Sequence, residues 1–84
     1  MYSIEFSKKA LKQFYQLEVG LQKNIVHVLD RIRIRPFNFV MKIVGSQYYR
    51  LRVGDYRLIL DIRKEKLIII VVYMGHRKKI YKKI

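Results

Sequence analysis

The amino-acid sequence predicts an α+β domain, in which an N-terminal strand and a helical hairpin precede three antiparallel strands. Apolar residues recur every three or four positions between 7 and 32, as they do on one face of a helix. β-Branched and aromatic residues dominate positions 48–74, where a Gly-Asp pair separates two strand-like runs. A chain of 84 residues is too short for two cores, because chains of this size bury only about 60% of their unfolded surface. We therefore expect one domain over residues 1–84, with the helices on one face of a twisted sheet.

The first part of the chain predicts a strand and two helices. Residues 2–6 alternate in polarity as a short strand does, and Ser7 is suited to cap a following helix. The helical spacing of apolar residues continues to Gly20, a residue type that commonly ends helices. The spacing resumes over 21–32, and Pro36 marks the limit of this second helix. These residues predict a helical hairpin with one shared apolar face.

The second half of the chain predicts a three-stranded antiparallel unit. After a connection over 37–46, strand-like runs cover 48–53, 56–62 and 67–74. Gly-Asp at 54–55 is a signal for a two-residue hairpin turn, which fixes the register of the strands on either side. Counting outward from this turn pairs Val53 with Tyr56, Arg52 with Arg57, Leu51 with Leu58, and Arg50 with Ile59.

This register divides the side chains of the hairpin between two faces of the sheet, because residues paired across strands share a face. One face collects Tyr49, Leu51, Val53, Tyr56, Leu58, Leu60 and Ile62. The other face collects Tyr48, Arg50, Arg52, Arg57, Ile59 and Asp61. We expect the apolar face to pack against the helices and the arginines to lie on an open, concave face. Like charges directly across two strands repel, so Arg52 opposite Arg57 indicates a functional site.

The charge of the chain indicates a polyanionic partner. Lys and Arg number 19 against 6 Asp and Glu, which gives a formal net charge of +13. A surface built only for solubility usually mixes both signs, and this one has few acids to mix. Nucleic acid is therefore the expected partner.

The same composition excludes several other classes. The chain has no Cys, so it can form neither disulfides nor a Cys-based zinc site, and its two isolated His residues do not make a metal site. We expect no metal and no cofactor. The start of the chain lacks the apolar block of a signal peptide, and the longest apolar run, 67–74, is too short to cross a bilayer. We expect a cytoplasmic protein with no membrane partner.

The end of the chain is strongly basic. Residues 75–84 carry five positive charges and one phenol directly after the last predicted strand. Strict alternation from the hairpin places His76, and not Arg77, on the face that carries the arginines. Two structures stay open here: a bulge at Gly75 that re-aims the chain, or a strand that has ended so that the tail curls over freely.

Several short motifs stand in a fixed order along the second half of the chain. They are Tyr49-Arg50-Leu51-Arg52, Gly54-Asp55-Tyr56-Arg57-Leu58, and Gly75-His76-Arg77 followed by Tyr81. With the strand and two helices that precede them, these motifs resemble the RelE family of the RelE/ParE superfamily, which are toxins of type II toxin–antitoxin systems. The resemblance covers nearly the whole chain, and the joint order and spacing of the motifs make it specific.

The resemblance implies a ribosome-dependent endoribonuclease that cuts mRNA without a metal, using the 2'-OH of the RNA against the neighbouring phosphate. A RelB-like antitoxin would neutralise it in a heteromeric complex. Arg57 matches the arginine that holds the scissile phosphate, Arg77 the arginine near the leaving oxygen, and Tyr81 the tyrosine near the 2'-OH or its base. Arg50 and Arg52 fall where some members carry lysines. Because arginine stays protonated, the role of general base does not transfer to Arg50.

The roles of two further residues stay open. Tyr81 can act as a base only if the surrounding cations lower its pKa, and it can instead stack on a nucleobase. His76 is either a proton carrier, a role that imidazole often takes, or a surface histidine. Further RNA contacts are expected from Arg50, Arg52, Lys78, Lys79 and Lys82.

Two alternatives to an mRNA endoribonuclease also fit these features. A ParE-like poison of DNA gyrase would use the same fold to bind a protein. A non-enzymatic RNA-binding protein would use the same charge.

Overall fold

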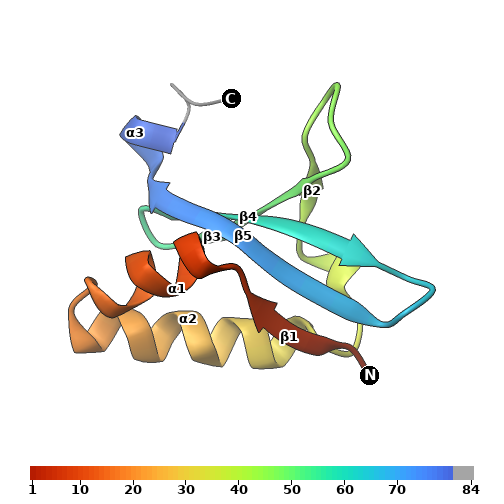
Figure 1. Ribbon diagram of the computed structural model, residues 1–84, viewed down its shortest axis with the longest axis horizontal. Coiled ribbons are helices and arrows are strands. Elements are labelled where there is room, and N and C mark those ends of the chain that lie inside the picture. Colours follow the sequence, from red (N-terminus) through yellow and green to blue (C-terminus); the bar gives the residue numbers. More distant parts are fainter. Residues whose placement is uncertain (81–84) are drawn as a thin grey trace.

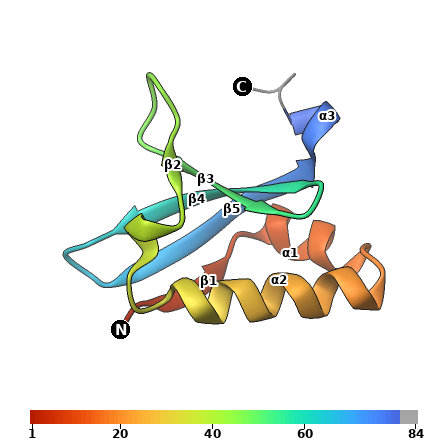
Figure 2. The same cartoon turned by 180° about the vertical axis from the view of Figure 1, so that it is seen from behind.

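A computed structural model describes residues 1–80 of the chain, with side chains described as far as Lys78. The elements, in chain order, are β1 (Ser3–Phe6), α1 (Lys8–Tyr15), α2 (Val19–Ile32), the 3₁₀ turn η1 (Pro36–Asn38), β2 (Met41–Lys42), β3 (Tyr49–Val53), β4 (Tyr56–Arg63), β5 (Ile68–His76) and α3 (Arg77–Ile80). Figure 1 shows α1 and α2 on one side of the sheet, and Figure 2 shows the same arrangement from behind. The predicted α+β class is confirmed. No helix within residues 1–80 is long and apolar enough to cross a membrane.

The five strands form one sheet in the order β1-β5-β4-β3-β2. The predicted pairing of β3 with β4 is confirmed, including Arg52 opposite Arg57 and Arg50 opposite Ile59. The sheet is mixed and not wholly antiparallel, because β1 pairs in parallel with β5. Both helices and three strands lie between β1 and β5 in the chain, so no tight turn forces these two strands to run in opposite directions.

The predicted end of the first helix at Gly20 is wrong. α1 ends at Tyr15, and Gly20 lies in the first turn of α2. The amide of Gln22 explains the early end, because its Nε2 donates to the carbonyl of Phe14 at 2.9 Å and to that of Leu17 at 3.1 Å. These contacts satisfy carbonyl groups that the end of a helix leaves without an intrahelical donor. A short turn therefore replaces the last part of the predicted helix.

The connection predicted over 37–46 contains structure that the sequence did not indicate. η1 begins it, and β2 then pairs in antiparallel fashion with β3, with Met41 opposite Arg50 and Lys42 opposite Tyr49. A strand of two residues has no polarity pattern of its own, so only its partner reveals it. β2 becomes the edge of the sheet beyond β3.

The core lies between the sheet and the two helices. Its buried members are Ala10, Ile25, Leu29, Ile32, Leu51, Val53, Leu58, Leu60, Ile69, Val71 and Met74. The apolar face predicted for the hairpin is thus the face that packs on the helices. Burial of this apolar surface is the main stabilising contribution to the fold.

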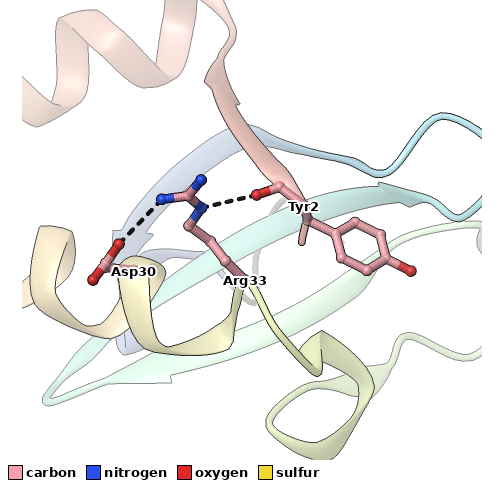
Figure 3. Close-up of polar contacts among 3 residues, drawn as sticks. All are labelled: Tyr2, Asp30 and Arg33. Atoms are coloured by element: carbon pink, nitrogen blue, oxygen red, sulfur yellow. Dashed lines mark hydrogen bonds and ion pairs between the residues drawn. The ribbon is translucent and has the colours of Figure 1, made fainter.

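A polar contact joins the end of α2 to the start of β1. The Nε of Arg33 donates to the carbonyl of Tyr2 at 2.8 Å, and the amide of Tyr2 donates to the carbonyl of Arg33 at 2.9 Å. Figure 3 shows Arg33 lying between Tyr2 and Asp30, whose Oδ1 is 3.2 Å from Nη1 of the arginine. These contacts hold the edge strand β1 against the C-terminal end of α2.

Candidate nucleic-acid interface

The face of the sheet opposite the helices carries the arginine cluster, and we call it the outer face. Its residues form rows across β3, β4 and β5: Arg52, Arg57 and Gly75 in one row, and Arg50, Ile59 and Tyr73 in the next. Neighbouring strands are about 4.8 Å apart and successive rows about 7 Å apart in a regular sheet. The three predicted arginines therefore share one small patch, on the side away from the helices.

Arg57 is the only charged side chain that is buried within the described part of the chain, with 6% of its surface exposed. The expectation of an open position is wrong for this residue, whereas Arg52 is exposed and Arg50 is half-buried. Arg57 lies on the central strand and so has neighbours on both sides, which an edge residue lacks. A guanidinium taken out of water interacts more strongly with a bound anion than an exposed one does.

A bulge in β5 decides which residues reach the outer face. Ile59 pairs with Tyr73 and the next residue, Leu60, pairs with Val71, so Val72 has no partner on β4. Because of this extra residue, Gly75 pairs with Arg57 on the outer face and His76 pairs with Tyr56 on the helix side. Neither predicted alternative holds as stated. A bulge does re-aim the chain, but it lies at Val72 and not at Gly75, and β5 continues to His76 before α3 begins.

Ser7 ties this bulge to α1. Its hydroxyl donates to the carbonyl of Val72 and accepts from the amide of Ala10 at 3.0 Å, so the predicted N-cap is confirmed. Nearby, Oε1 of Gln13 accepts from the amide of Met74 at 2.8 Å. α1 thus covers the edge of β5 beyond the end of β1, and its polar side chains satisfy backbone groups that would otherwise lack partners.

His76 does not join the arginines. Its ring packs edge-on against Tyr56 with the centroids 5.8 Å apart, and its Nδ1 accepts from the amide of Lys78 at 3.3 Å. With Tyr56 it lines a cavity of about 370 Å³ beside the start of α2, which Glu18 and Asn24 also line. The structure therefore separates His76 from Arg57 by the thickness of the sheet.

Arg77 begins α3, and its amide donates to the carbonyl of Asp55 at 2.8 Å. This bond holds the start of α3 at the turn between β3 and β4. Figures 1 and 2 show α3 and the loop between β2 and β3 on the side of the sheet away from α2. The side chains of Arg77 and Lys78 are exposed. Lys79 lies in α3, but its side chain, Tyr81 and Lys82 lie outside the described residues.

Tyr73 and Tyr48 are both on the outer face, and the sequence patterns did not predict that they share it. Burial, and secondarily the nearby phenol of Tyr48, raise the pKa of Tyr73 above its usual value. The ammonium nitrogen of Lys9, from α1, lies 5.2 Å from the centroid of the Tyr73 ring. Tyr73 reaches the outer face because of the bulge at Val72, which no local pattern in the sequence reveals.

The arginines of the outer face offer hydrogen-bond donors and positive charge. Arginine presents several N–H donors and no acceptor, which suits phosphate oxygens and excludes proton abstraction. The only carboxylate predicted for this face, Asp61, pairs with Arg63 at 3.2 Å. No group of three His, Cys, Asp or Glu side chains suited to hold a metal ion occurs among the described residues.

Comparison with known proteins defines the class. Residues 4–81 match the family described as ParE toxin of type II toxin-antitoxin system, parDE. The chain therefore belongs to this family of toxins, which lies within the RelE/ParE superfamily indicated by the sequence motifs.

Individual relatives carry the RelE name. The chain is 29% identical over 82 residues to the mRNA interferase toxin RelE of Escherichia coli, covering 93% of this chain and 85% of the relative. The isolated E. coli RelE toxin has the same fold, with a TM-score of 0.81 and 23% identity over 99% of this chain and 94% of that one. The intact E. coli RelBE toxin–antitoxin complex gives a TM-score of 0.77 and 25% identity, over 90% of this chain and 96% of that chain. The predicted RelE resemblance is confirmed.

Proposed function

We propose that this toxin cuts mRNA bound to the ribosome and is neutralised by a RelB-like antitoxin. The observation that carries the proposal is the pairing of Arg52 with the buried Arg57 on the outer face. Two like charges directly opposite each other cost stability, and a phosphate bound between them would turn that repulsion into attraction. The name mRNA interferase, borne by a relative of 29% identity, supports RNA as the polyanion.

The proposed reaction is an in-line transfer at phosphorus. The 2'-OH of one nucleotide attacks the adjacent phosphorus, the bond to the 5'-oxygen of the next nucleotide breaks, and a 2',3'-cyclic phosphate remains. The 2'-OH loses a proton and the leaving 5'-oxygen gains one, so protons balance and no metal is required. Arg57 donates to the phosphate oxygens as negative charge develops, and Arg77 donates near the leaving oxygen.

The general base is not an arginine, because a guanidinium does not release its proton near neutral pH. Tyr81 remains the candidate from this chain: a role as base would require cations to lower its pKa, and its ring can instead stack on a nucleobase. His76 remains a candidate proton carrier by motif, although its position across the sheet from Arg57 favours a structural role. Arg50, Lys78, Lys79 and Lys82 would hold the RNA backbone.

The antitoxin would bind exposed apolar surface and cover the site. Val19 and Val26 of α2 are 63% and 53% exposed. Val26, with Ile4 and Phe6, lines a cavity of about 470 Å³ between α2 and β1. An acidic, amphipathic segment suits this surface on a chain of formal charge +13. A RelE-type toxin bound to RelB in the E. coli complex supports such a partner.

One experiment separates this proposal from its alternatives. Purified toxin is added to ribosomes translating a defined mRNA in the absence of DNA, and the ends of the mRNA are mapped. The proposal, which places the protein in the cytoplasm where translation occurs, predicts cuts within codons that appear only when ribosomes are present. An intact mRNA, together with DNA breaks by gyrase in a parallel reaction, would instead establish the gyrase poison. Stable RNA binding without any cut would establish the non-enzymatic alternative.

A further inference from the structure

The second row of the outer face combines a cation with an aromatic ring. Arg50 on β3 and Tyr73 on β5 flank Ile59, which is completely buried. Tyr48 directly precedes β3 and shares the outer face with Arg50 by alternation. Tyr48 and Tyr73 are both half-buried, so part of each phenol remains accessible. The row next to the Arg52–Arg57 pair is thus aromatic on one side.

Tyr73 and Tyr48 lie on either side of β4, Tyr73 on β5 and Tyr48 directly before β3. The phenol of Tyr48 contributes, after burial, to the raised pKa of Tyr73. No stacked or edge-on contact joins the two rings within the described residues, so each phenol has ring surface that the other does not occupy. Lys9 adds a positive charge 5.2 Å from the centre of the Tyr73 ring. The pair therefore offers ring surface beside cations.

This combination is what single-stranded nucleic acid binds. Bases stack on aromatic side chains with little preference for sequence, while cations along the same groove hold the phosphates. Tyr73 lies one strand across and one row along from Arg57, a diagonal separation of about 7–8 Å in a regular sheet. A base extends over a comparable distance from its own phosphate, so the two residues can contact a single nucleotide.

We propose that Tyr73, with Tyr48 beside it, is a stacking platform for the nucleobase next to the phosphate that Arg57 and Arg52 bind. The proposal rests on the proposed function, in which RNA lies on the outer face. Lys9 then contacts a neighbouring phosphate from the edge of the sheet. The platform positions the RNA, and the arginines act on the scissile phosphate.

A purely structural role of Tyr73 and Tyr48 would give a different result. If the phenols served only to cover Ile59, any apolar side chain of similar size would replace them without loss of RNA binding. Tyr73→Leu keeps apolar cover and removes the ring, whereas Tyr73→Phe keeps the ring and removes only the hydroxyl. Tyr15→Leu is the matched control, because Tyr15 is a 70% exposed tyrosine on α1, away from the outer face.

The test measures affinity for two short single-stranded oligonucleotides of equal length. Both carry 2'-O-methyl riboses, so neither can be cut, and one lacks every base while keeping every phosphate. Stacking on one aromatic ring contributes about 5- to 150-fold in affinity. Tyr73→Leu should weaken binding of the base-containing oligonucleotide by a factor in this range and leave binding of the abasic one unchanged. Tyr73→Phe and Tyr15→Leu should bind both as the wild type does, and all variants should show unchanged thermal unfolding midpoints.

Two results overturn the platform: equal losses on both oligonucleotides, or no loss on either. Cleavage of mRNA on ribosomes, measured separately, keeps this test distinct from that of the proposed function. If the wild type cuts mRNA but Tyr73→Leu binds bases normally, the platform alone is wrong. If base-dependent binding is lost in Tyr73→Leu but no mRNA is cut by the wild type, the proposed function is wrong and the platform stands.

Discussion

The hydroxyl of Ser7 donates to the carbonyl of Val72, the one residue of β5 that the β4 register skips. The same oxygen accepts from the amide of Ala10 and so begins α1. One side chain therefore starts a helix and fixes the bulge that brings Gly75 beside Arg57. The geometry of the outer face depends on this contact between positions 65 residues apart.

Ser7→Ala should destabilise the protein by about 1–2 kcal/mol, because it removes a helix cap and leaves the Val72 carbonyl without its donor. Urea unfolding measures this change in the free energy of unfolding. Ser3→Ala is the control, since Ser3 is exposed on β1. Equal stability of the two variants would mean that the Ser7 contact does not stabilise the bulge.

Arg57→Ala should slow cleavage of ribosome-bound mRNA about 100-fold or more, the loss expected when one preorganised donor to a developing oxyanion is removed. Arg57→Lys should recover only part of this rate, because an ammonium lacks the planar pair of donors. Single-turnover cleavage rates measure both variants. Arg35→Ala, a change at an exposed arginine near η1, should cut at the wild-type rate. Cleavage by Arg57→Ala at the wild-type rate would show that Arg57 does not take part in the reaction.

Arg77→Ala should likewise slow cleavage about 100-fold, while binding to the ribosome falls much less because many other cations remain. Lys78→Ala is the neighbouring control and should affect binding more than rate. Comparing rates at saturating toxin with the apparent affinity separates the two effects. A loss confined to affinity would make Arg77 a simple phosphate contact.

Hydroxyl and imidazole chemistry can be tested by two conservative changes. Tyr81→Phe keeps the ring, so a large loss of rate would support proton transfer and a near-normal rate would support stacking.

His76→Gln should retain most activity, because His76 packs on Tyr56 at the helix side of the sheet. A loss of 100-fold or more in His76→Gln would show that the imidazole does reach the RNA.

The affinity for single-stranded RNA should depend strongly on salt. If about six phosphates are neutralised, the logarithm of the binding constant should fall with the logarithm of the salt concentration with a slope of about 4 in magnitude. Fluorescence anisotropy at several salt concentrations measures this slope. A slope near zero would contradict an electrostatic interface.

The sequence predicted the parts of the fold that local patterns determine. Gly54, with a φ of +58°, and Asp55 form the predicted turn, and the pairing of Arg52 with Arg57 follows from counting outward. The burial of Arg57 was missed, because it depends on the position of β4 at the centre of the sheet. The face of His76 could not be decided from the sequence, because it depends on a bulge in β5 that Ser7 contacts from the other end of the chain.

Cleavage by the 2'-OH of the RNA is tested most directly by programming ribosomes with an mRNA that carries one 2'-deoxynucleotide at the mapped cut site. We expect wild-type toxin to cut the all-ribose mRNA there, leaving a 2',3'-cyclic phosphate, and to leave the deoxy-substituted mRNA intact at that position. Cutting of the substituted mRNA at the same site and rate would contradict this mechanism.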